Sequence, residues 1–195
     1  MARAVRRAQI LAVAQELFAR DGFHHVSMDD IANSAEVSKP VLYRHFPSKL
    51  DLYLDVVDHR GEALVSAIDT TLEMVVDGET DGRSVVRALV RAYVEFVETA
   101  GDSSSLLFES DVTRDSAVRH RVEQASAAAE SICRGLRELA GLPAAQAELL
   151  ATALVGLARV AATSRYRSQE VSIEDTVELI TQLAWRGVAG FVKER

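Results

Sequence analysis

Cysteine, proline and glycine are scarce in this chain of 195 residues. The single cysteine, Cys133, excludes an intramolecular disulfide and a zinc site built on several cysteines. Cys133 itself is expected to be a buried apolar residue, with a redox sensor as the alternative. Three prolines and ten glycines leave few chain-breaking positions, and aromatic residues make up only 6% of the chain. This composition predicts an all-α protein with a core of alanine, leucine and valine.

Long hydrophobic runs, a leader sequence and catalytic motifs are also missing. The longest apolar stretch, residues 149–158, ends at Arg159 and is short of the roughly 20 residues that span a membrane. The first residues carry charge but no apolar segment follows them, unlike a signal peptide. No Gly-x-Ser-x-Gly, His-Glu-x-x-His or phosphate-binding glycine loop occurs. We therefore expect a cytoplasmic protein that is not an enzyme and needs no cofactor or metal.

Positive charge is scarce overall but unevenly placed. Residues 1–50 contain 7 Lys and Arg against 5 Asp and Glu, a balance of +2. Residues 51–195 contain 15 against 24, a balance of −9, and the two sum to the net charge of −7. Nucleic acid would therefore be bound only through the N-terminal part.

Two short helical patterns separated by a tight turn occupy residues 27–49. Ser27-x-x-Asp30 matches a capping box at the start of the first pattern, and Ser38 precedes the second, with Pro40 in its first turn. Leu42 and Phe46 form the inward face of the second helix, which leaves cationic and aromatic side chains exposed. This arrangement is typical of a helix-turn-helix whose second helix enters the DNA major groove.

Helical periodicity covers most of the remaining chain. A first helix is expected over residues 3–21, ending at Gly22, and a long helix over 48–77 begins with Ser48-x-x-Asp51. Further helices are expected over 84–100, 115–139 and 143–168, and the last begins with Ser172-x-x-Asp175. A short apolar segment covers 106–108. We expect a DNA-binding domain over 1–47, a three-helix bundle with the helix-turn-helix, and a second helical domain over 48–195.

The N-terminal part resembles the tetracycline-repressor (TetR) family of bacterial regulators. The residues that carry the resemblance are Ala14-x-x-Leu17-Phe18, Gly22-Phe23, Asp30-Ile31-Ala32, Val37-Ser38-Lys39-Pro40-Val41-Leu42-Tyr43-Arg44-His45-Phe46 and Ser48-Lys49. One departure is Glu36, at the turn where the family usually has glycine. If this position needs a positive φ, glutamate costs about 1 kcal/mol there.

The resemblance implies a regulator that binds a palindromic DNA operator as a homodimer, with residues 48–195 as its effector-binding and dimerisation domain. A repressor is expected, with an activator as the alternative; a helical interaction module without DNA binding is the rival interpretation. The residues assigned to the DNA face are Ser27, Ser38, Lys39, Pro40, Val41, Tyr43, Arg44, His45 and Lys49. The last two helices are expected to pair with those of a second subunit, because one helix-turn-helix reads few base pairs. The alternative is that they only complete the core of the monomer.

An apolar small molecule is the expected effector. The side chains that could line its site are Tyr93, Phe96, Leu107, Phe108, Leu157, Tyr166 and Trp185, although packing in the core is the preferred interpretation for each one alone. Segments 96–98, 106–111 and 153–157 are similar to actinobacterial regulators of fatty-acid synthesis, which implies a long-chain acyl-CoA or fatty acid. Lipophilic drugs and other apolar metabolites are the alternatives.

Overall fold

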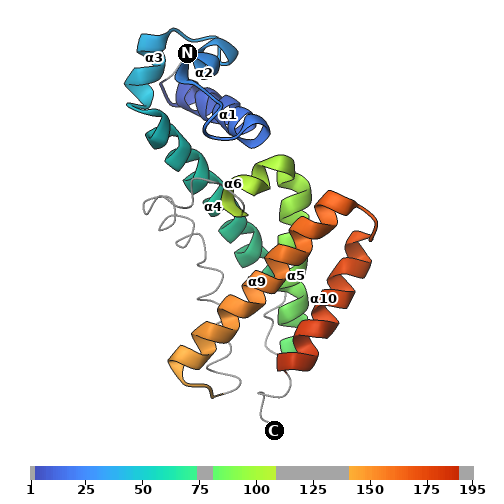
Figure 1. The fold of residues 1–195 in the computed structure, drawn as a ribbon. Helices are drawn as coiled ribbons and strands as arrows, with labels where there is room; N and C mark the ends of the chain where they lie inside the picture. The colour runs from blue at the N-terminus through green and yellow to red at the C-terminus, as the bar shows by residue number, and fades with distance from the viewer. Residues whose placement is uncertain (1–2, 74–80, 109–140, 189–195) are drawn as a thin grey trace. The chain divides into compact units, whose positions relative to one another are not determined.

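Every element that the structure describes is helical, as the composition predicts. The structure is a computed structural model, and it describes residues 3–73, 81–108 and 141–188. Its elements are α1 (Arg3–Asp21), α2 (Met28–Ser34), α3 (Lys39–His45), α4 (Lys49–Glu73), α5 (Gly82–Ala100), a 3₁₀ turn (Gly101–Ser104), α6 (Ser105–Phe108), α9 (Ala144–Ser168) and α10 (Ile173–Val188) (Figure 1). The helix expected over 115–139, the end of the helix expected over 48–77, and Cys133 lie outside the described residues.

The described residues form two compact units. The first contains the residues up to 62 together with 102–108, and the second contains those from 63 to 101 together with 141–188. The helix α4 contributes its first half to the first unit and its remaining part to the second. One continuous helix therefore links the two.

The first unit has a small core that holds the helix-turn-helix. Ile10 and Ala14 of α1, Ile31 of α2 and Leu42 of α3 are fully buried. Aromatic rings extend this core toward α4, where Tyr53 makes edge-to-face contacts with Phe18 and Phe23 at centroid distances of 5.3 and 5.0 Å. Such edge-to-face pairs stabilise beyond their buried area by about 0.5–1.5 kcal/mol each.

The helix starts agree with the Ser-x-x-Asp patterns. At α2 the Ser27 hydroxyl accepts from the Asp30 amide at 3.1 Å, and the Asp30 carboxylate accepts from the Ser27 amide at 2.9 Å. The amides of Asp51 and Asp175 likewise donate to Ser48 and Ser172, at 3.1 and 3.0 Å. Three predicted caps are therefore confirmed, each satisfying an amide that the helix leaves unpaired.

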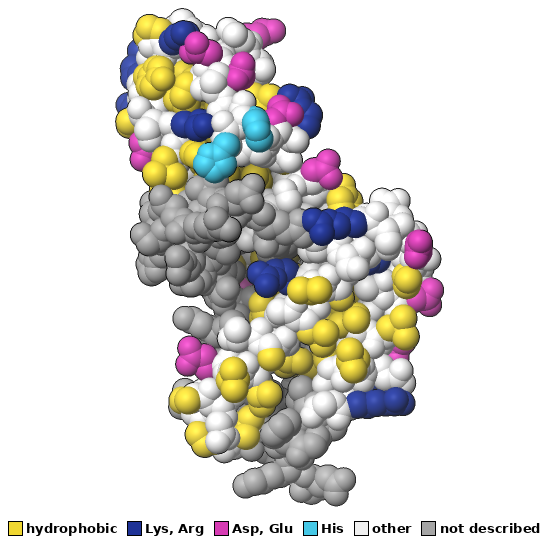
Figure 2. Space-filling view, in the orientation of Figure 1, with side chains coloured by type: hydrophobic (Ala, Val, Ile, Leu, Met, Phe, Trp, Pro, Cys, Tyr) yellow, Lys and Arg dark blue, Asp and Glu magenta, His cyan; other side chains and the backbone are white. Residues whose placement is uncertain are grey.

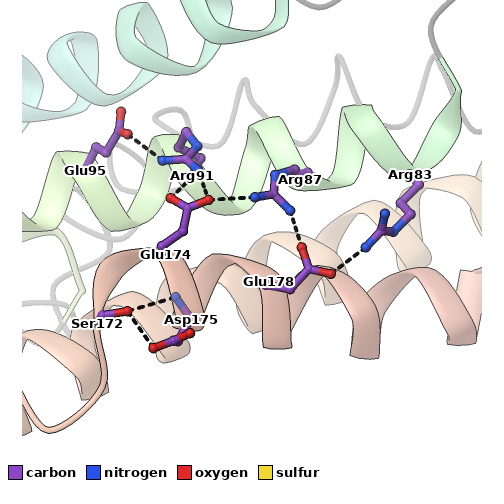
Figure 3. Close-up of polar contacts among 8 residues, drawn as sticks. All are labelled: Arg83, Arg87, Arg91, Glu95, Ser172, Glu174, Asp175 and Glu178. Atoms are coloured by element: carbon purple, nitrogen blue, oxygen red, sulfur yellow. Dashed lines mark hydrogen bonds and ion pairs between the residues drawn. The ribbon is translucent and has the colours of Figure 1, made fainter.

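In the second unit α5 packs against α9 and α10. The buried face of α5 includes Leu89, Tyr93, Phe96 and Val97. Along one edge, three arginines of α5 meet two glutamates of α10 (Figure 3). Arg91 binds Glu174 at 2.7 Å, Arg87 reaches both glutamates, and Arg83 binds Glu178. Because these groups are partly exposed, each pair contributes only a fraction of a kcal/mol, up to about 1 kcal/mol, and the row mainly sets the register of the two helices.

The helix α9 is apolar on two faces. Ala147, Ala151, Leu154, Ala158 and Ala162 are buried. On another side of the helix Leu149 and Val160 are 70% and 61% exposed, and a Cβ added at Gly156 would touch nothing. By length and composition α9 could also cross a membrane, but only 28% of its most apolar window is buried within the chain. The exposed side of α9 is therefore a surface that another molecule can cover.

Candidate nucleic-acid interface

The turn between α2 and α3 is a Schellman motif, with glutamate at its left-handed position. The amide of Val37 donates to the Ala32 carbonyl at 3.0 Å, and that of Glu36 donates to Asn33 at 3.1 Å. This pair of hydrogen bonds requires a positive φ at the residue after the helix C-cap, and Glu36 has φ 53°. Position 36 therefore needs the positive φ at which glutamate is strained and glycine is not. The Gln9 side chain also donates to the Ala35 carbonyl at 3.1 Å, which ties the turn to α1.

Replacing Glu36 with glycine should stabilise the first unit by about 1 kcal/mol, because glycine adopts a positive φ without steric cost. Part of this gain is offset by the larger backbone entropy of glycine in the unfolded chain. Thermal or urea unfolding of the variant would measure it. Glu36→Ala is the matched comparison, since it removes the carboxylate but keeps the Cβ; an equal gain in both variants would mean that charge, not strain, is the cause.

The helix α3 presents an exposed polar surface. Ser38 is its N-cap by position, but its hydroxyl makes no capping hydrogen bond and is available to a ligand. Tyr43 is 46% exposed, and Arg44 is exposed without a hydrogen bond or ion pair to any described residue. Lys39 is also exposed, but its ammonium binds Asp29 at 2.7 Å, and this raises its pKa. DNA phosphate would have to compete with Asp29 for Lys39, whereas Arg44 has no such partner among the described residues.

A surface hollow of about 620 Å³ lies beside α3. It is lined by Arg3, Arg6, Glu36, Val37, Ser38, Val41, Arg44 and His45. Partial burial lowers the pKa of the His45 imidazole, and the charges of four arginines lower it further: Arg3, Arg44, Arg7 and Arg6. A depressed pKa favours neutral His45 at pH 7. The hollow therefore carries its positive charge on arginine, which suits contacts with the DNA backbone.

The N-terminal arginines of α1 differ in their availability. Arg7 is ion-paired with Asp55 of α4 and lies 5.0 Å from the centre of the Phe46 ring. Arg6 donates to Gln9 at 3.0 Å. Arg3 makes no hydrogen bond or ion pair with the part of the chain that the structure describes. Arg3 is therefore the best placed of the three to reach phosphate, while Arg7 holds α1 against α4.

Two residues expected on the DNA face have structural partners: Lys49 has partners that the sequence did not indicate, and Ser27 is in the capping box that the sequence predicted. Lys49 donates to the carbonyls of Phe23 and Val26, at 2.9 and 3.0 Å, and its ammonium lies 4.3 Å from the centre of the Phe23 ring. The Ser27 hydroxyl gives its hydrogen to Asp30 at 2.6 Å. Lys49 keeps one N–H donor beyond these two bonds, so its contact with phosphate stays a prediction. Pro40 and Val41 lie on α3, exposed and half-buried.

Replacing Lys49 with alanine should destabilise the first unit by about 1–3 kcal/mol, because two charge-assisted hydrogen bonds are lost and two carbonyls lose their donors. Unfolding by urea, followed by circular dichroism, would measure this change. Lys39→Ala is the matched control, because an exposed lysine–aspartate pair contributes at most about 1 kcal/mol. Equal losses in the two variants would contradict the structural role of Lys49.

The residues suggested for an effector site are mostly in the second unit. Tyr93 and Phe96 are buried on α5, and Leu157, Tyr166 and Trp185 are half-buried on α9 and α10. The Trp185 ring packs on Gly82 so closely that an added Cβ would lie 2.8 Å from it, so its position is explained by packing. Burial raises the pKa of Tyr93 to about 12. Leu107 is buried in the first unit, and the side chain of Phe108 lies outside the described residues.

Comparison with known proteins identifies the family. Residues 10–56 match the model of the bacterial regulatory proteins of the tetR family. The chain is 35% identical over 188 residues to the transcriptional activator FasR of Mycolicibacterium smegmatis, covering 94% of this chain and 83% of that protein. The chain belongs to the TetR family. TetR-family proteins are DNA-binding transcriptional regulators, so this protein is a regulator and not an enzyme.

One further relative matches over part of the chain, and a solved structure matches over nearly all of it. The regulator EthR of Mycolicibacterium smegmatis is 38% identical over 68 residues, which cover 35% of this chain and 31% of EthR. A TetR-like regulator from Rhodococcus sp. RHA1 matches as a structure with a TM-score of 0.74 at 29% identity, covering 97% and 99% of the two chains. The predicted fold, a helix-turn-helix followed by a helical C-terminal part, is thereby confirmed.

Proposed function

We propose that this TetR-family regulator binds a palindromic operator as a homodimer and that an apolar effector controls the binding. Residues 1–47 would supply the DNA-binding domain, and the chain from residue 48 onward the effector and dimer contacts, in the cytoplasm. The observation that carries the DNA-binding part is the exposed face of α3, where Ser38 and Arg44 have no side-chain partner among the described residues. Arginine in this position can bind guanine O6 and N7 through two hydrogen bonds.

The exposed apolar sides of α9 and α10 support the homodimer. On α9, Leu149, Ala153, Gly156 and Val160 recur at helical spacing and are exposed or half-buried. On α10, Leu179 and Leu183 are 58% and 61% exposed. Figure 2 shows hydrophobic side chains gathered over the face formed by α9 and α10. Four large aliphatic side chains on two adjacent helices form a patch of the kind that marks an interface in water-soluble proteins. A second copy of the same two helices is the occupant that we propose, since two-fold pairing joins the same patch to itself.

The sign of regulation that we propose is activation. The support is the full-length similarity to a relative whose name describes an activator, at 35% identity. Repression, the expectation from the family resemblance, is the competing outcome. Transcription from the operator-containing promoter in the presence and absence of the protein would separate the two.

The effector that we propose is a long-chain acyl group carried by coenzyme A or as the free acid. The sequence segments similar to fatty-acid-synthesis regulators support it. Within the second unit, Tyr93 is buried and lies within electrostatic range of Arg159, whose charge lowers the Tyr93 pKa against the larger effect of burial. A hydroxyl and a guanidinium beside an apolar helix face suit a molecule with one polar end. Because α4 belongs to both units, a shift of its second half would move the first unit with it.

Two experiments test the proposed function. A gel shift with the upstream region of the protein's own gene should give a salt-sensitive complex; no such complex with any genomic fragment would contradict operator binding. Native mass spectrometry of protein purified from its host should reveal a co-purified lipid or acyl-CoA. Added ligand should also raise the melting temperature in proportion to the logarithm of its concentration above Kd. A response to polar metabolites instead would contradict an apolar effector.

A further inference from the structure

Glu36 combines a strained backbone conformation with a carboxylate that contacts no polar partner among the described residues. Its φ of 53° lies in the left-handed region, which sterically disfavours a side chain with a Cβ. Among the residues that the structure describes, the carboxylate makes no hydrogen bond or ion pair, although Arg3, Arg6 and Arg44 line the same hollow. The backbone hydrogen bonds of the turn hold this φ, but they do not involve the carboxylate. Residues held in sparsely populated backbone regions cluster at ligand-binding sites.

The position of Glu36 limits which chemical groups of DNA its carboxylate could contact. Glu36 lies two residues before Ser38, the N-cap of α3, and shares the hollow with Ser38, Val41 and Arg44. In a helix-turn-helix, the N-terminal end of the second helix meets the edges of the bases. A carboxylate only accepts hydrogen bonds, and it repels phosphate. The donors on the major-groove edges are the amino groups of cytosine and adenine.

The geometry points to Glu36 as a specificity-determining residue whose carboxylate accepts a hydrogen bond from the 4-amino group of one cytosine in each half-site. This inference rests on the proposed DNA face. Cytosine fits better than adenine because the adenine amino group is beside the acceptor N7, which repels a second carboxylate oxygen. At sites without this cytosine, Glu36 is desolvated next to DNA and lowers the affinity for non-specific sequences.

Selection from randomised DNA duplexes tests the inference. Wild-type protein should enrich cytosine about ten-fold over other bases at one position of each half-site. Glu36→Gly should lose the preference at that position and keep the others, with higher affinity for random DNA. Glu36→Gln keeps the length of the side chain and should shift the preference toward adenine, which a glutamine amide binds through N6 and N7. Glu16→Gln, the matched control, changes the same charge on an exposed part of α1 that does not line the hollow, and should select the wild-type sequence.

The outcomes separate this inference from the proposed function. Unchanged base preferences in both Glu36 variants would overturn it, as would a uniform gain in affinity for all sequences, which would reduce Glu36 to a repulsive charge. Wild-type protein that enriches no sequence at all would instead contradict operator recognition, before any variant is compared. The melting temperatures of the variants verify that they are folded, and Glu36→Gly is expected to have a higher melting temperature than the wild-type protein.

Discussion

Replacing Leu179 and Leu183 with aspartate should convert the proposed dimer into a folded monomer. Both leucines are exposed on α10 within the protomer, at 58% and 61%, so neither is needed for its core. Two-fold symmetry places four such side chains in one interface. Burying the exposed part of each stabilises association by about 1–2 kcal/mol, roughly 4–8 kcal/mol together. The association constant should therefore fall about a thousand-fold or more.

Sedimentation equilibrium of the double variant would measure the change in mass, and a gel shift would measure the loss of operator affinity that follows when two half-sites are no longer bound together. Val171→Asp is the matched control, because Val171 is 39% exposed in the loop between α9 and α10, outside the two apolar stripes. A double variant that stays dimeric at micromolar concentration would place the dimer contact elsewhere. Unchanged circular dichroism is expected for both proteins.

Replacing Arg44 with alanine should weaken operator binding by about 1–3 kcal/mol, which corresponds to roughly 5- to 150-fold, and should relax the preference at one base pair. Arg44 is exposed and has no partner among the described residues, so its loss should leave the stability within about 0.5 kcal/mol. Fluorescence anisotropy with operator and random duplexes, at two salt concentrations, measures both effects.

Arg44→Lys separates charge from geometry at the same position. Lysine keeps the positive charge but lacks the planar pair of donors, so non-specific binding should recover while the base preference does not. Arg20→Ala is a matched control in the first unit, because Arg20 is exposed at the end of α1 and is paired with Asp21, away from the hollow. Equal losses for operator and random DNA in Arg44→Ala would contradict its role in base reading.

Local signals account for the part of the fold that was predictable. The Ser-x-x-Asp patterns at Ser27, Ser48 and Ser172 each act within one helical turn, so four residues of sequence contain both partners of the hydrogen bond. Gly22 has φ 77° and ends α1 as expected. This signal is also local, because one glycine at the helix end provides the left-handed conformation. The start of α5, expected at residue 84, was missed by two residues because the helix is capped by Asp81, whose carboxylate accepts from the Ser84 amide.

Contacts between distant residues were not predictable from these patterns. The arginines of α5 and the glutamates of α10 are 83 to 95 positions apart, and nothing in either helix alone specifies its partner. In α9 the sequence does not distinguish covered from uncovered small residues: Ala151 and Ala158 are buried, whereas Ala153 is exposed. A helix that is apolar on two sides has no single periodic stripe, so only its neighbours distinguish core from interface.

The sequence by itself determined the helical class, the helix-turn-helix and the family, because these depend on local caps, short spacings and a dense motif over residues 10–56. Tertiary structure alone decided what Lys49 and Glu36 do. Lys49 reaches carbonyls 23 and 26 positions earlier, a contact that exists only when α4 packs on the loop after α1. Glu36 was recognised as unusual in the sequence, but its place beside the arginines that line the hollow, without a hydrogen bond or ion pair to any described residue, follows from how α1, α2 and α3 pack together.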